Sequence, residues 1–373
     1  MKKIVVLGSG MVGRVMAADL SRDFEVTAVD VSRANLDHLQ KTPVKGLQAD
    51  LAAAGAVRDI VGGYDLVIGA VPGSMGFAAL AEVIAAGKDV VDISFFPEDA
   101  FRLDDAARKA GVTAVVDCGV APGMSNMILG YHAARMTVAR FECYVGGLPF
   151  RREFPFEYKA PFSPADVIEE YTRPARYVEN GHVVVKPALS DVEHLEFPEV
   201  GTLEAFNSDG LRTLLGTMKV PNMIEKTLRY PGHGEHIRAL RDSGFFDREE
   251  IEVAGARVRP LDVTSAVLFK HWRLHEDDDE FTVMRIVVAG EADGRPKRVE
   301  YGLFDRRDRK TGYSSMARTT GFPATAAARL VLAGKFARKG ICPPEFIGAD
   351  ESSFRTVMDE LAARNVVYHR TEE

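Results

Sequence analysis

The N-terminal segment carries a glycine pattern that fits dinucleotide binding. Gly8-Ser9-Gly10-Met11-Val12-Gly13 matches G-x-G-x-x-G and directly follows the apolar run of residues 3–7. The first glycine permits a tight turn, the second lets the backbone approach a pyrophosphate, and the third lets a helix pack closely on the preceding strand. The helix would offer free N–H groups and a positive dipole end to the phosphates. The expected cofactor contacts here are Gly8, Gly10, Met11, Val12 and Gly13.

An acidic residue stands where this motif requires one. Asp30 follows Gly10 by twenty residues, at the end of the next apolar run. A carboxylate there accepts hydrogen bonds from the adenosine ribose and repels a 2′-phosphate, so NAD is favoured over NADP. Arg33 is counter-evidence because it could pair with that phosphate, and a helix cap or loop salt bridge is the alternative role for Asp30. Further cofactor contacts are expected along the same sheet edge at Val31, Asp50, Ala70, Val71, Pro72 and Ser94.

The elements that carry these residues alternate along the first part of the chain. Strands are expected at residues 3–7, 26–31, 66–71, 90–94 and 112–117, with helical stretches such as 11–20 and 97–110 between them. Strands that are apolar on both faces and separated by helices predict a parallel sheet covered on both sides. The fold class is therefore α/β, with an N-terminal doubly wound Rossmann sheet.

Near residue 140 the pattern changes to that of a second, α+β domain with a mostly antiparallel sheet. A strand at 141–146 leads into an aromatic, proline-rich loop, and a helix is expected at 165–171. Residues 281–289 and 298–304 flank a turn and predict antiparallel neighbours. Later, Pro323 suits the first turn of an alanine-rich helix at 324–332.

Three domain segments follow from this pattern. Residues 1–125 form the Rossmann domain, which a helix around 318–345 completes. Residues 126–317 form a domain for substrate binding and dimerisation, and residues 346–373 form a C-terminal segment of uncertain assignment. We expect a homodimer or a dimer of dimers, with the apolar strand 281–289 pairing across a two-fold axis.

Composition excludes several classes of protein. Among the 373 residues, 47 Lys and Arg stand against 54 Asp and Glu, which disfavours a nucleic-acid binder. Three cysteines without a Cys-x-x-Cys pair disfavour a disulfide framework or a zinc site and fit a reducing compartment. No apolar run is long enough to span a bilayer, so we expect a cytoplasmic protein without a membrane partner. The runs 275–280 and 305–310 are expected to be solvated loops, and no metal is expected because three adjacent aspartates cannot all face one ion.

Five motifs, in their order along the chain, give a family resemblance. They are residues 117–126 (DCGVAPGMSN), 144–149 (YVGGLP), 227–233 (TLRYPGH), 316–323 (MARTTGFP) and 340–345 (GICPPE). In this order they resemble the saccharopine dehydrogenase-like family, and within it the L-lysine 6-dehydrogenases. The resemblance implies a Rossmann domain joined to a second α/β domain, with hydride passed from the substrate to a nicotinamide cofactor.

One departure from the family pattern bears on the reaction. Saccharopine reductases carry an aspartate close to their substrate where this chain has Ala121. The resemblance therefore favours oxidative deamination of the terminal amine of L-lysine by NAD, giving 2-aminoadipate 6-semialdehyde, ammonia and NADH. The alternatives are a saccharopine dehydrogenase or related condensing enzyme, which needs a second arginine such as Arg212 or Arg318 near Arg229, and a non-catalytic NAD sensor.

Such a reaction needs a cation for the α-carboxylate and a group that accepts a proton from the amine. Arg229 is the first candidate for the carboxylate, because its guanidinium fork matches a carboxylate bidentately, although a structural ion pair is the alternative. His233 lies in the glycine-rich segment that follows and could accept a proton or activate water. A histidine hydrogen-bonded to the loop backbone is the alternative role.

Further candidates lie on loops and strand ends. Glu157 and Tyr158, in the aromatic loop, could line a slot for the substrate chain or only bridge the domains. Asp92 and Asp117 end parallel strands and could orient the nicotinamide amide or a water, or only fix a loop. The remaining substrate-binding candidates are Asn207 and Asp209, for which helix capping is the alternative, and Met124, within the motif at 117–126.

Overall fold

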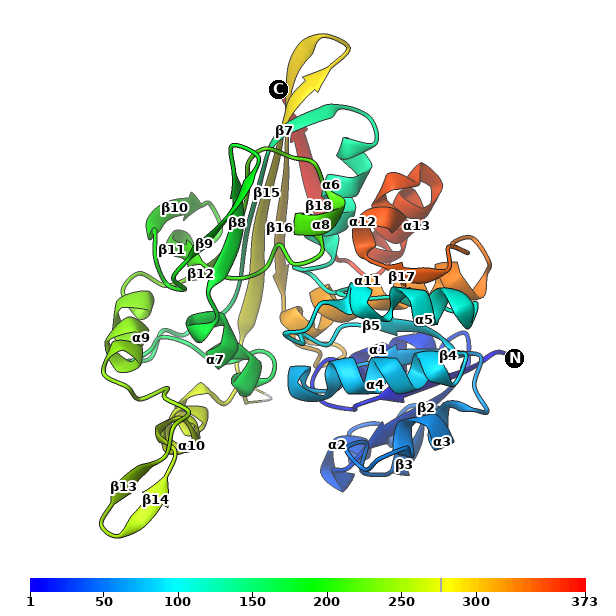
Figure 1. Cartoon of the computed structure of the whole chain (residues 1–373), viewed down its shortest axis with the longest axis horizontal. Helices are drawn as coiled ribbons and strands as arrows, with labels where there is room; N and C mark the ends of the chain where they lie inside the picture. The colour runs from blue at the N-terminus through cyan, green and yellow to red at the C-terminus, as the bar shows by residue number, and fades with distance from the viewer. Residues whose placement is uncertain (276) are drawn as a thin grey trace. The chain divides into compact units, whose positions relative to one another are not determined.

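The computed structural model describes residues 1–275 and 277–373, and it divides the chain into two compact units. Unit 1 comprises Met1–Val138, Gly290–Lys297 and Met316–Tyr368. Unit 2 comprises Ala139–Ala289, Arg298–Ser315 and His369–Glu373. The chain thus crosses between the units several times, and each unit combines segments that are distant in sequence (Figure 1).

Unit 1 is built on a parallel sheet in the Rossmann order. The sheet has seven strands in the order β17-β6-β5-β4-β1-β2-β3, and the paired registers run parallel. This confirms the doubly wound fold expected from the strand pattern, and β3 and β17 extend it at its two edges by strands that the pattern did not predict. The strands are β1 (Lys3–Leu7), β2 (Glu25–Asp30), β3 (Lys45–Gln48), β4 (Leu66–Gly69), β5 (Asp89–Asp92), β6 (Thr113–Val115) and β17 (Gly340–Cys342).

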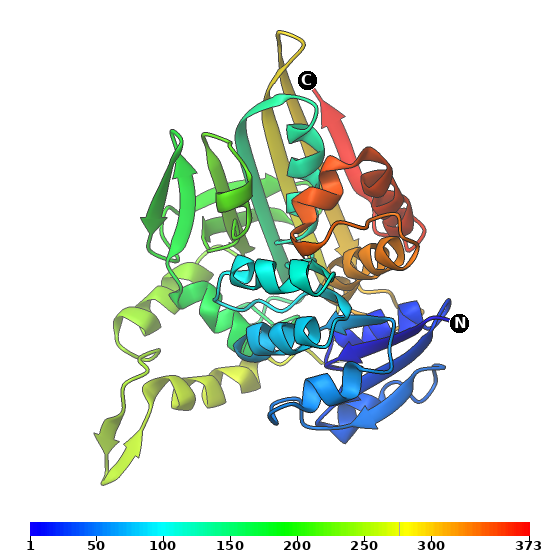
Figure 2. The same cartoon turned by 45° about the vertical axis from the view of Figure 1, so that its right-hand side comes forward.

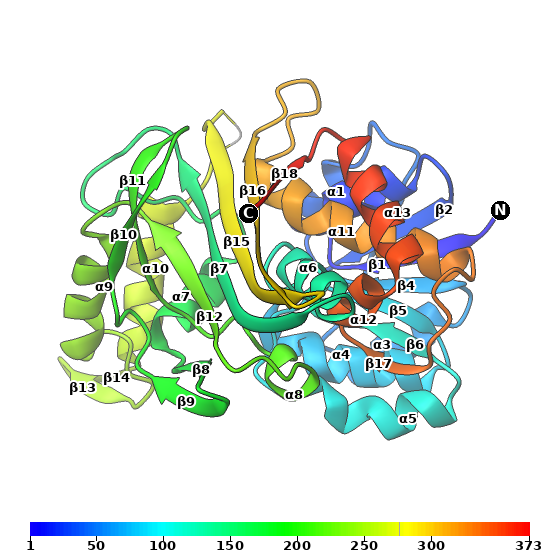
Figure 3. The same ribbon diagram turned by 90° about the horizontal axis from the view of Figure 1, so that it is seen from above.

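Helices cover both faces of this sheet. Figure 3 shows α1 and α11 on one face and α3, α4 and α5 on the other. Ile4, Val5 and Val6 of β1 are fully buried, as a strand covered on both faces requires. The helices are α1 (Gly13–Leu20), α2 (Arg33–Asp37), α3 (Ala56–Val61), α4 (Gly73–Ala85), the 3-10 helix η1 (Ala100–Leu103), α5 (Asp104–Lys109), α6 (Met124–Ala133), α11 (Ser315–Leu332), α12 (Pro344–Ala349) and α13 (Glu351–Ala362).

The start of the long late helix differs from the sequence prediction. Helix α11 begins at Ser315, so Pro323 lies inside the helix and not in its first turn. Tertiary packing outweighs the cost of an interior proline, since Met316 and Ala317 are buried and Gly321 lies against Met16 of α1.

The expected domain boundary at residue 125 falls inside α6, and the expected C-terminal segment 346–373 is divided between the two units after Tyr368.

Helix α6 belongs to unit 1 because it crosses α12 at very short range. A Cβ on Gly130 would lie 2.2 Å from the carbonyl oxygen of Glu345, and one on Gly348 would lie 1.9 Å from that of Met127. Glycine at both positions lets the backbones of α6 and α12 come into direct contact. The segments near residues 126 and 345 therefore lie side by side.

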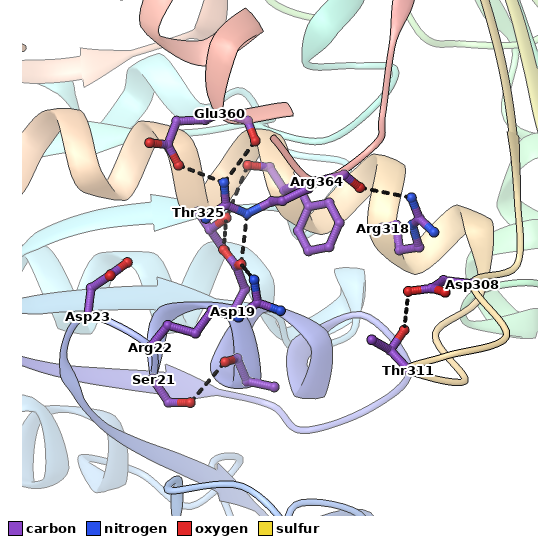
Figure 4. Close-up of polar contacts among 12 residues, drawn as sticks. Asp19, Ser21, Arg22, Asp23, Asp308, Thr311, Arg318, Thr325, Glu360 and Arg364 are labelled. Carbon is purple, nitrogen blue, oxygen red and sulfur yellow. Dashed lines mark hydrogen bonds and ion pairs between the residues drawn. The ribbon is translucent and has the colours of Figure 1, made fainter. Parts of the chain in front are cut away.

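A buried carboxylate connects α1 to the C-terminal helices of unit 1 (Figure 4). The side chain of Asp19 is 1% exposed, and its Oδ1 accepts a hydrogen bond from Arg364 Nε at 2.7 Å. Its Oδ2 accepts from Arg329 Nη1 at 2.9 Å and from Thr325 Oγ1 at 2.8 Å. Glu360 binds the other side of the Arg364 guanidinium at 2.7 Å. Because buried charges must be paired, this cluster holds α11 and α13 in place against α1.

Unit 2 is built on a mixed sheet of nine strands. Its main order is β10-β11-β12-β7-β15-β16-β18, with β8 beside β12 and β9 beside β8 (Figure 3). The registers of β10–β11, β11–β12 and β8–β9 run antiparallel, whereas β12 pairs with β7 in parallel. The strands are β7 (Thr137–Pro149), β8 (Ala175–Glu179), β9 (His182–Lys186), β10 (Glu193–Phe197), β11 (Gly201–Asn207), β12 (Met223–Arg229), β15 (Glu280–Ala292), β16 (Arg295–Arg306) and β18 (Tyr368–Glu372).

The expected hairpin is present, but its first strand is not an exposed face. Asp293 and Gly294 join β15 to β16 with φ values of 51° and 75°, as a tight hairpin turn requires. Strand β15 lies between β7 and β16, and Phe281, Ile286 and Val288 are fully buried. The backbone of residues 281–289 therefore has no free edge for strand pairing with a second copy of the chain, because it already has partners on both sides. Homodimerisation stays a prediction without an assigned face.

Four helices and a small hairpin complete unit 2. The helices are α7 (Pro164–Thr172), α8 (Leu214–Thr217), α9 (His233–Asp242) and α10 (Pro260–Trp272). A hairpin of β13 (Ile251–Val253) and β14 (Ala256–Val258) precedes α10 and extends away from the rest of unit 2 (Figure 2, yellow-green). Trp272, Tyr171 and Phe206 lie at the centre of the core.

Residues 1–275 and 277–373 lack both a membrane-spanning helix and a cluster of metal ligands. They contain no helix long and apolar enough to cross a membrane. They also contain no group of three or more His, Cys, Asp or Glu side chains placed to hold a metal ion. Glu276, in the acidic run at 275–280, lies outside the described residues, and Asp279 of that run pairs with Arg309.

We expect Asp19→Asn to lower the free energy of unfolding of unit 1 by about 3 kcal/mol, because it leaves the partly buried Arg329 and Arg364 without the charge of the buried carboxylate that they share. Burial raises the pKa of Asp19, but the hydrogen bond from Arg364 and the charge of Arg329 bring it below its ordinary value. The stabilisation should therefore be complete above the unfolded-state pKa of about 3.9 and lost as the pH falls through the lowered folded-state pKa.

Urea denaturation at several pH values measures this effect. Glu351→Gln is the control, because it breaks an exposed i,i+4 pair with Arg355 and should change stability by less than about 0.5 kcal/mol. Equal losses in the two variants would contradict the role of Asp19.

Candidate functional site

The glycine loop of unit 1 has the geometry of a phosphate-binding turn. Gly8 has φ +97°, and a Cβ there would lie 2.4 Å from the Ala70 carbonyl oxygen. A Cβ on Gly13 would lie 2.1 Å from the Gly8 carbonyl oxygen, whereas one on Gly10 would meet nothing within 4 Å. Gly8 and Gly13 are thus required by the fold, and Gly10 leaves open space beside the loop.

Unpartnered polar groups also fit a bound dinucleotide. Helix α1 begins without a side-chain cap, since Val12 is its N-cap residue. The buried Ser9 Oγ makes no hydrogen bond among the described residues. The N–H of Gly13 at the start of α1 and the Ser9 hydroxyl are donors that a pyrophosphate could use, whereas Arg14 N and Val15 N donate to the Gly10 and Val12 carbonyl oxygens. The loop residues fit the cofactor, which they would hold at Gly8–Gly13.

Asp30 holds this loop in shape. Its Oδ2 accepts a hydrogen bond from Ser9 N at 2.7 Å, and its Oδ1 accepts one from Ser32 N at 2.8 Å. Its side chain thus fixes the backbone on both sides of the expected ribose position. Arg33 is engaged with Asp37 at 3.1 Å on α2. The ribose contact itself stays a prediction.

The other expected cofactor residues lie at or near the carboxyl ends of the sheet strands. Val31 is 63% exposed after β2, and Asp50 accepts from Ala52 N in an exposed turn after β3. After β4, the Ala70 backbone contacts Gly8, Val71 follows it, and Pro72 is the N-cap residue of α4. Ser94 follows β5 and is buried.

Two buried aspartates follow at the same edge. Asp92 accepts from Ser94 N at 2.8 Å and Ser94 Oγ at 3.2 Å, and its carboxylate fills the place of a side chain on Gly69. Asp117 follows β6 with φ 54°. Burial, Asp117 and Asp92 raise the pKa of the Cys118 thiol, so the thiol remains protonated. The catalytic roles predicted for the two aspartates stay predictions.

Met124 opens α6 and is fully buried. The residues around it are fixed by Asn126, whose Oδ1 accepts from Gly123 N at 3.1 Å and whose Nδ2 donates to Glu345 at 3.1 Å. Substrate contact by Met124 stays a prediction.

Unit 2 holds a buried polar group that we call the Arg229 cluster: Arg229, Glu170, Tyr158, Tyr171 and His233. Arg229 Nε donates to Tyr171 Oη at 3.0 Å, and Nη2 donates to Glu170 Oε2 at 2.9 Å and to Tyr158 Oη at 3.4 Å. The guanidinium lies 4.4 Å from the centre of the Tyr158 ring. Burial opposes the charge of Arg229, but Tyr158, Tyr171 and Glu170 raise its pKa above the ordinary value.

His233 is held in one tautomer within this cluster. Its Nδ1 lies 2.9 Å from the Phe156 carbonyl oxygen, and its Nε2 lies 3.0 Å from Tyr171 Oη. A carbonyl can only accept, so Nδ1 donates and Nε2 accepts from the tyrosine. Burial and the charge of Arg229 lower the pKa of His233 to about 3. The imidazole is therefore neutral at physiological pH.

Several elements position the cluster. Arg229 ends β12, Glu170 and Tyr171 lie on α7, and His233 opens α9. Glu204 of β11 accepts a hydrogen bond from Gly232 N at 2.7 Å and another from Gly234 N, which fixes the start of α9. The Trp272 ring packs edge-to-face on Tyr158 and Tyr171, with centroids 5.5 and 6.1 Å apart.

Three expected site residues lie in other contacts. Asp209 binds Arg176 bidentately at 2.9 and 2.8 Å, which is a loop-fixing ion pair and not a helix cap. Glu157 accepts from Arg152 at 2.6 Å. Asn207 is buried and donates to Ser190 Oγ at 2.9 Å. The structure joins two of the predicted substrate-binding residues, Arg229 and Tyr158, to His233, which was predicted to be catalytic.

Sequence reasoning missed Glu170 and Tyr171. The signal was present, because Val167, Glu170 and Tyr171 share one face of a helix by their i, i+3, i+4 spacing. Val167 and Tyr171 are buried, so an acid between them on that face needed a buried cationic partner.

Two family models match the chain along nearly its whole length. The model described as the saccharopine dehydrogenase NADP binding domain matches residues 4–115, and that described as the saccharopine dehydrogenase C-terminal domain matches residues 119–367. The chain belongs to the saccharopine dehydrogenase family. The family resemblance of the five motifs is thereby confirmed, whereas the lysine 6-dehydrogenase subgroup stays a prediction.

Named relatives within this family differ in length. The bovine alpha-aminoadipic semialdehyde synthase, mitochondrial, is 24% identical and matches 98% of this chain but 47% of its own length. The chain thus spans about half of that relative. The Saccharomyces cerevisiae saccharopine dehydrogenase [NADP(+), L-glutamate-forming] is 23% identical over 92% of this chain and 94% of its own. The Synechocystis carboxyaminopropylagmatine dehydrogenase is 23% identical over 94% of each chain.

A solved structure supports the fold of this family member. The apo saccharopine dehydrogenase (L-Glu forming) from Saccharomyces cerevisiae superposes with a TM-score of 0.80 at 21% identity, over 100% of both chains. At that identity the likeness shows the fold alone.

Two glycine variants separate folding from cofactor binding. Gly10→Ala should melt at the same temperature as the unmodified chain but bind NADH at least about tenfold more weakly, because its methyl group fills the space a pyrophosphate would approach. Gly13→Ala should lower the melting temperature, since its Cβ would lie 2.1 Å from the Gly8 carbonyl oxygen. Thermal melts without nucleotide and NADH fluorescence titrations measure both effects, and unchanged NADH binding by Gly10→Ala would contradict the assignment.

Proposed function

We propose that this family member is an oxidoreductase that oxidises the terminal amine of L-lysine with NAD and releases ammonia and 2-aminoadipate 6-semialdehyde. The observation that carries the proposal is Arg229, a buried cation in unit 2 whose Nη2 is bound to the partly exposed Glu170, a position that an α-carboxylate could take. Ala121 supports it, since the saccharopine reductases that the chain resembles carry an aspartate at that place. The relatives named alpha-aminoadipic semialdehyde synthase and saccharopine dehydrogenase support a substrate of the amino-acid class.

Residues of the two units have separate tasks in the proposed reaction. When bound, NAD supplies the hydride acceptor. Arg229 would hold the α-carboxylate, with Tyr158 packed on its guanidinium. Asp92 and Asp117 would orient the nicotinamide amide or the water that hydrolyses the imine. Both ring nitrogens of His233 have protein partners, which favours a role in orienting Tyr171 over direct proton transfer.

A second candidate is oxidation of a secondary amine that carries more carboxylates, such as saccharopine. Two further cations of unit 2 favour it: Arg173, which follows α7 and stands three residues after Glu170 in the sequence, and Arg212. Burial and the charge of Arg212 lower the pKa of Arg173. Arg318, the other arginine considered, donates to the Arg364 carbonyl oxygen at 3.0 Å within unit 1.

Product analysis distinguishes these reactions. Purified protein is assayed with NAD and lysine, ornithine, diaminobutyrate or saccharopine, and NADH and ammonia are followed together. The lysine reaction should release ammonia in step with NADH. NADH from saccharopine without ammonia, and none from lysine, would replace the first proposal with the second. Tight NAD binding with no turnover of any amino acid would indicate a sensor.

The pH profile adds an independent test of the lysine reaction. Activity should rise from about pH 7 to about pH 10 as the substrate ammonium, with a pKa of about 10.4, loses its proton. His233, with its pKa lowered to about 3 by burial and Arg229, should add no inflection in this range. A fall in activity on the acid side centred near pH 6.5 would contradict this reading.

The choice of NAD is tested at Asp30. We expect the unmodified protein to prefer NAD, and Asp30→Ala to weaken NAD and lower the NAD-to-NADP ratio of kcat/KM at least about tenfold, because the charge that repels a 2′-phosphate is lost. Arg33→Ala is the matched variant and should leave that ratio unchanged, since Arg33 pairs with Asp37. Better use of NADP by the unmodified protein, lost in Arg33→Ala, would reverse the assignment.

A further inference from the structure

Glu170 is the exposed member of an otherwise buried ion pair. Its side chain is 21% exposed, whereas that of Arg229 is 3% exposed. Oε2 accepts from Arg229 Nη2 at 2.9 Å. Oε1 accepts no hydrogen bond from the residues that the structure describes, so one oxygen of this carboxylate has no protein partner although the group stands beside a buried cation.

The Arg229 guanidinium is fixed from every other side. Nε is bound to Tyr171, Nη1 donates to the Leu228 carbonyl oxygen at 2.9 Å, and two tyrosine rings lie 4.4 and 5.7 Å from its centre. These partners are buried and neutral. Glu170 is the partner that is both charged and partly exposed, so it is the one that an incoming carboxylate can replace without a change in the charge around Arg229.

We propose that Glu170 and Arg229 form a receptor for the zwitterionic end of a free α-amino acid, in which Glu170 selects the α-ammonium. The ligand carboxylate takes the place of Glu170 on Nη2, and the ligand ammonium, one carbon away, pairs with the released Glu170 carboxylate. The inference rests on the proposed function for its substrate class.

Charge balance makes this receptor selective for ligands with both groups. A ligand with a carboxylate but no α-ammonium leaves Glu170 as an uncompensated anion in a partly buried place, which is costly. A ligand with an amine but no carboxylate leaves the Arg229–Glu170 pair intact and gains only one exposed contact. A zwitterion replaces one ion pair with two.

Three other acids of unit 2 are held in ion pairs of their own. Asp209 is held bidentately by Arg176, and Glu157 is bound to Arg152. Glu169 precedes Glu170 on α7 and pairs with Arg173 and Arg248. Glu170 alone among these four carboxylates is bonded to Arg229.

Binding can be measured without turnover. Trp272 is the sole tryptophan of the chain, and its ring packs on Tyr158 and Tyr171, so its fluorescence reports events in the Arg229 cluster. With NADH absent, the unmodified protein is titrated with lysine, 6-aminohexanoate (no α-amine) and cadaverine (no carboxylate). We expect lysine to bind at least about tenfold more tightly than either analogue, as loss of a charged hydrogen bond implies.

Charge-matched variants assign the selection to Glu170. Glu170→Gln should weaken the binding of lysine and strengthen that of 6-aminohexanoate, because Arg229 then lacks a competing anion. The ratio of the lysine affinity to the 6-aminohexanoate affinity should therefore fall at least about tenfold. Glu169→Gln removes the same charge one residue away and should leave the preference unchanged. If Glu170 had only a structural role, Glu170→Gln would weaken the binding of both ligands equally.

The outcomes separate this inference from the proposed reaction. Selective lysine binding that depends on Glu170, without NADH formation, would keep the receptor and reject the reaction. NADH formation from lysine with equal binding of 6-aminohexanoate would keep the reaction and overturn the receptor. If Glu170→Gln does not fold, the three-ligand series on the unmodified protein decides, and a lysine affinity no better than that of cadaverine overturns the inference.

Discussion

The buried carboxylate of Asp19 is the interaction on which the arrangement of unit 1 depends. It lies on the helix that follows the glycine loop, and its partners, Arg329 of α11 and Arg364 just after α13, come more than 300 residues later in the chain. Closing so long a loop is entropically costly, and three hydrogen bonds to one buried charge offset part of that cost. Because α1 begins at the glycine loop, the contact that joins Asp19 to the late segments of unit 1 also anchors the helix that follows this loop.

The Arg229 cluster shows the same physical rule applied to a binding group. A guanidinium that is almost fully buried keeps its charge because tyrosine oxygens, aromatic rings and one carboxylate surround it. The neutral His233 orients Tyr171 by accepting a hydrogen bond from its hydroxyl group. A cation held in this way has a fixed direction, so a ligand that approaches it must supply a carboxylate and must also balance the charge of Glu170.

Sequence reasoning reached the fold of unit 1 and failed on particulars of unit 2. The parallel sheet followed from apolar strands and helices that alternate over short distances. Strand 281–289 was expected to offer an apolar face, but its apolar residues serve a central strand with neighbours on both sides. A hydrophobic pattern reports that a strand is buried, and it does not report which element covers it.

The sequence by itself determined the features that depend on local spacing: the glycine loop, Asp30 at the end of β2, and the family to which the five motifs belong. The tertiary structure alone decided which polar groups meet. Arg229 of β12 pairs with Glu170 of α7, and Asp209 pairs with Arg176. Helix α11 begins at Ser315 and continues through Pro323. The reason is physical: a turn or a strand is specified by neighbours a few residues away, whereas the partner of a buried charge is chosen by packing between segments that are distant in the chain.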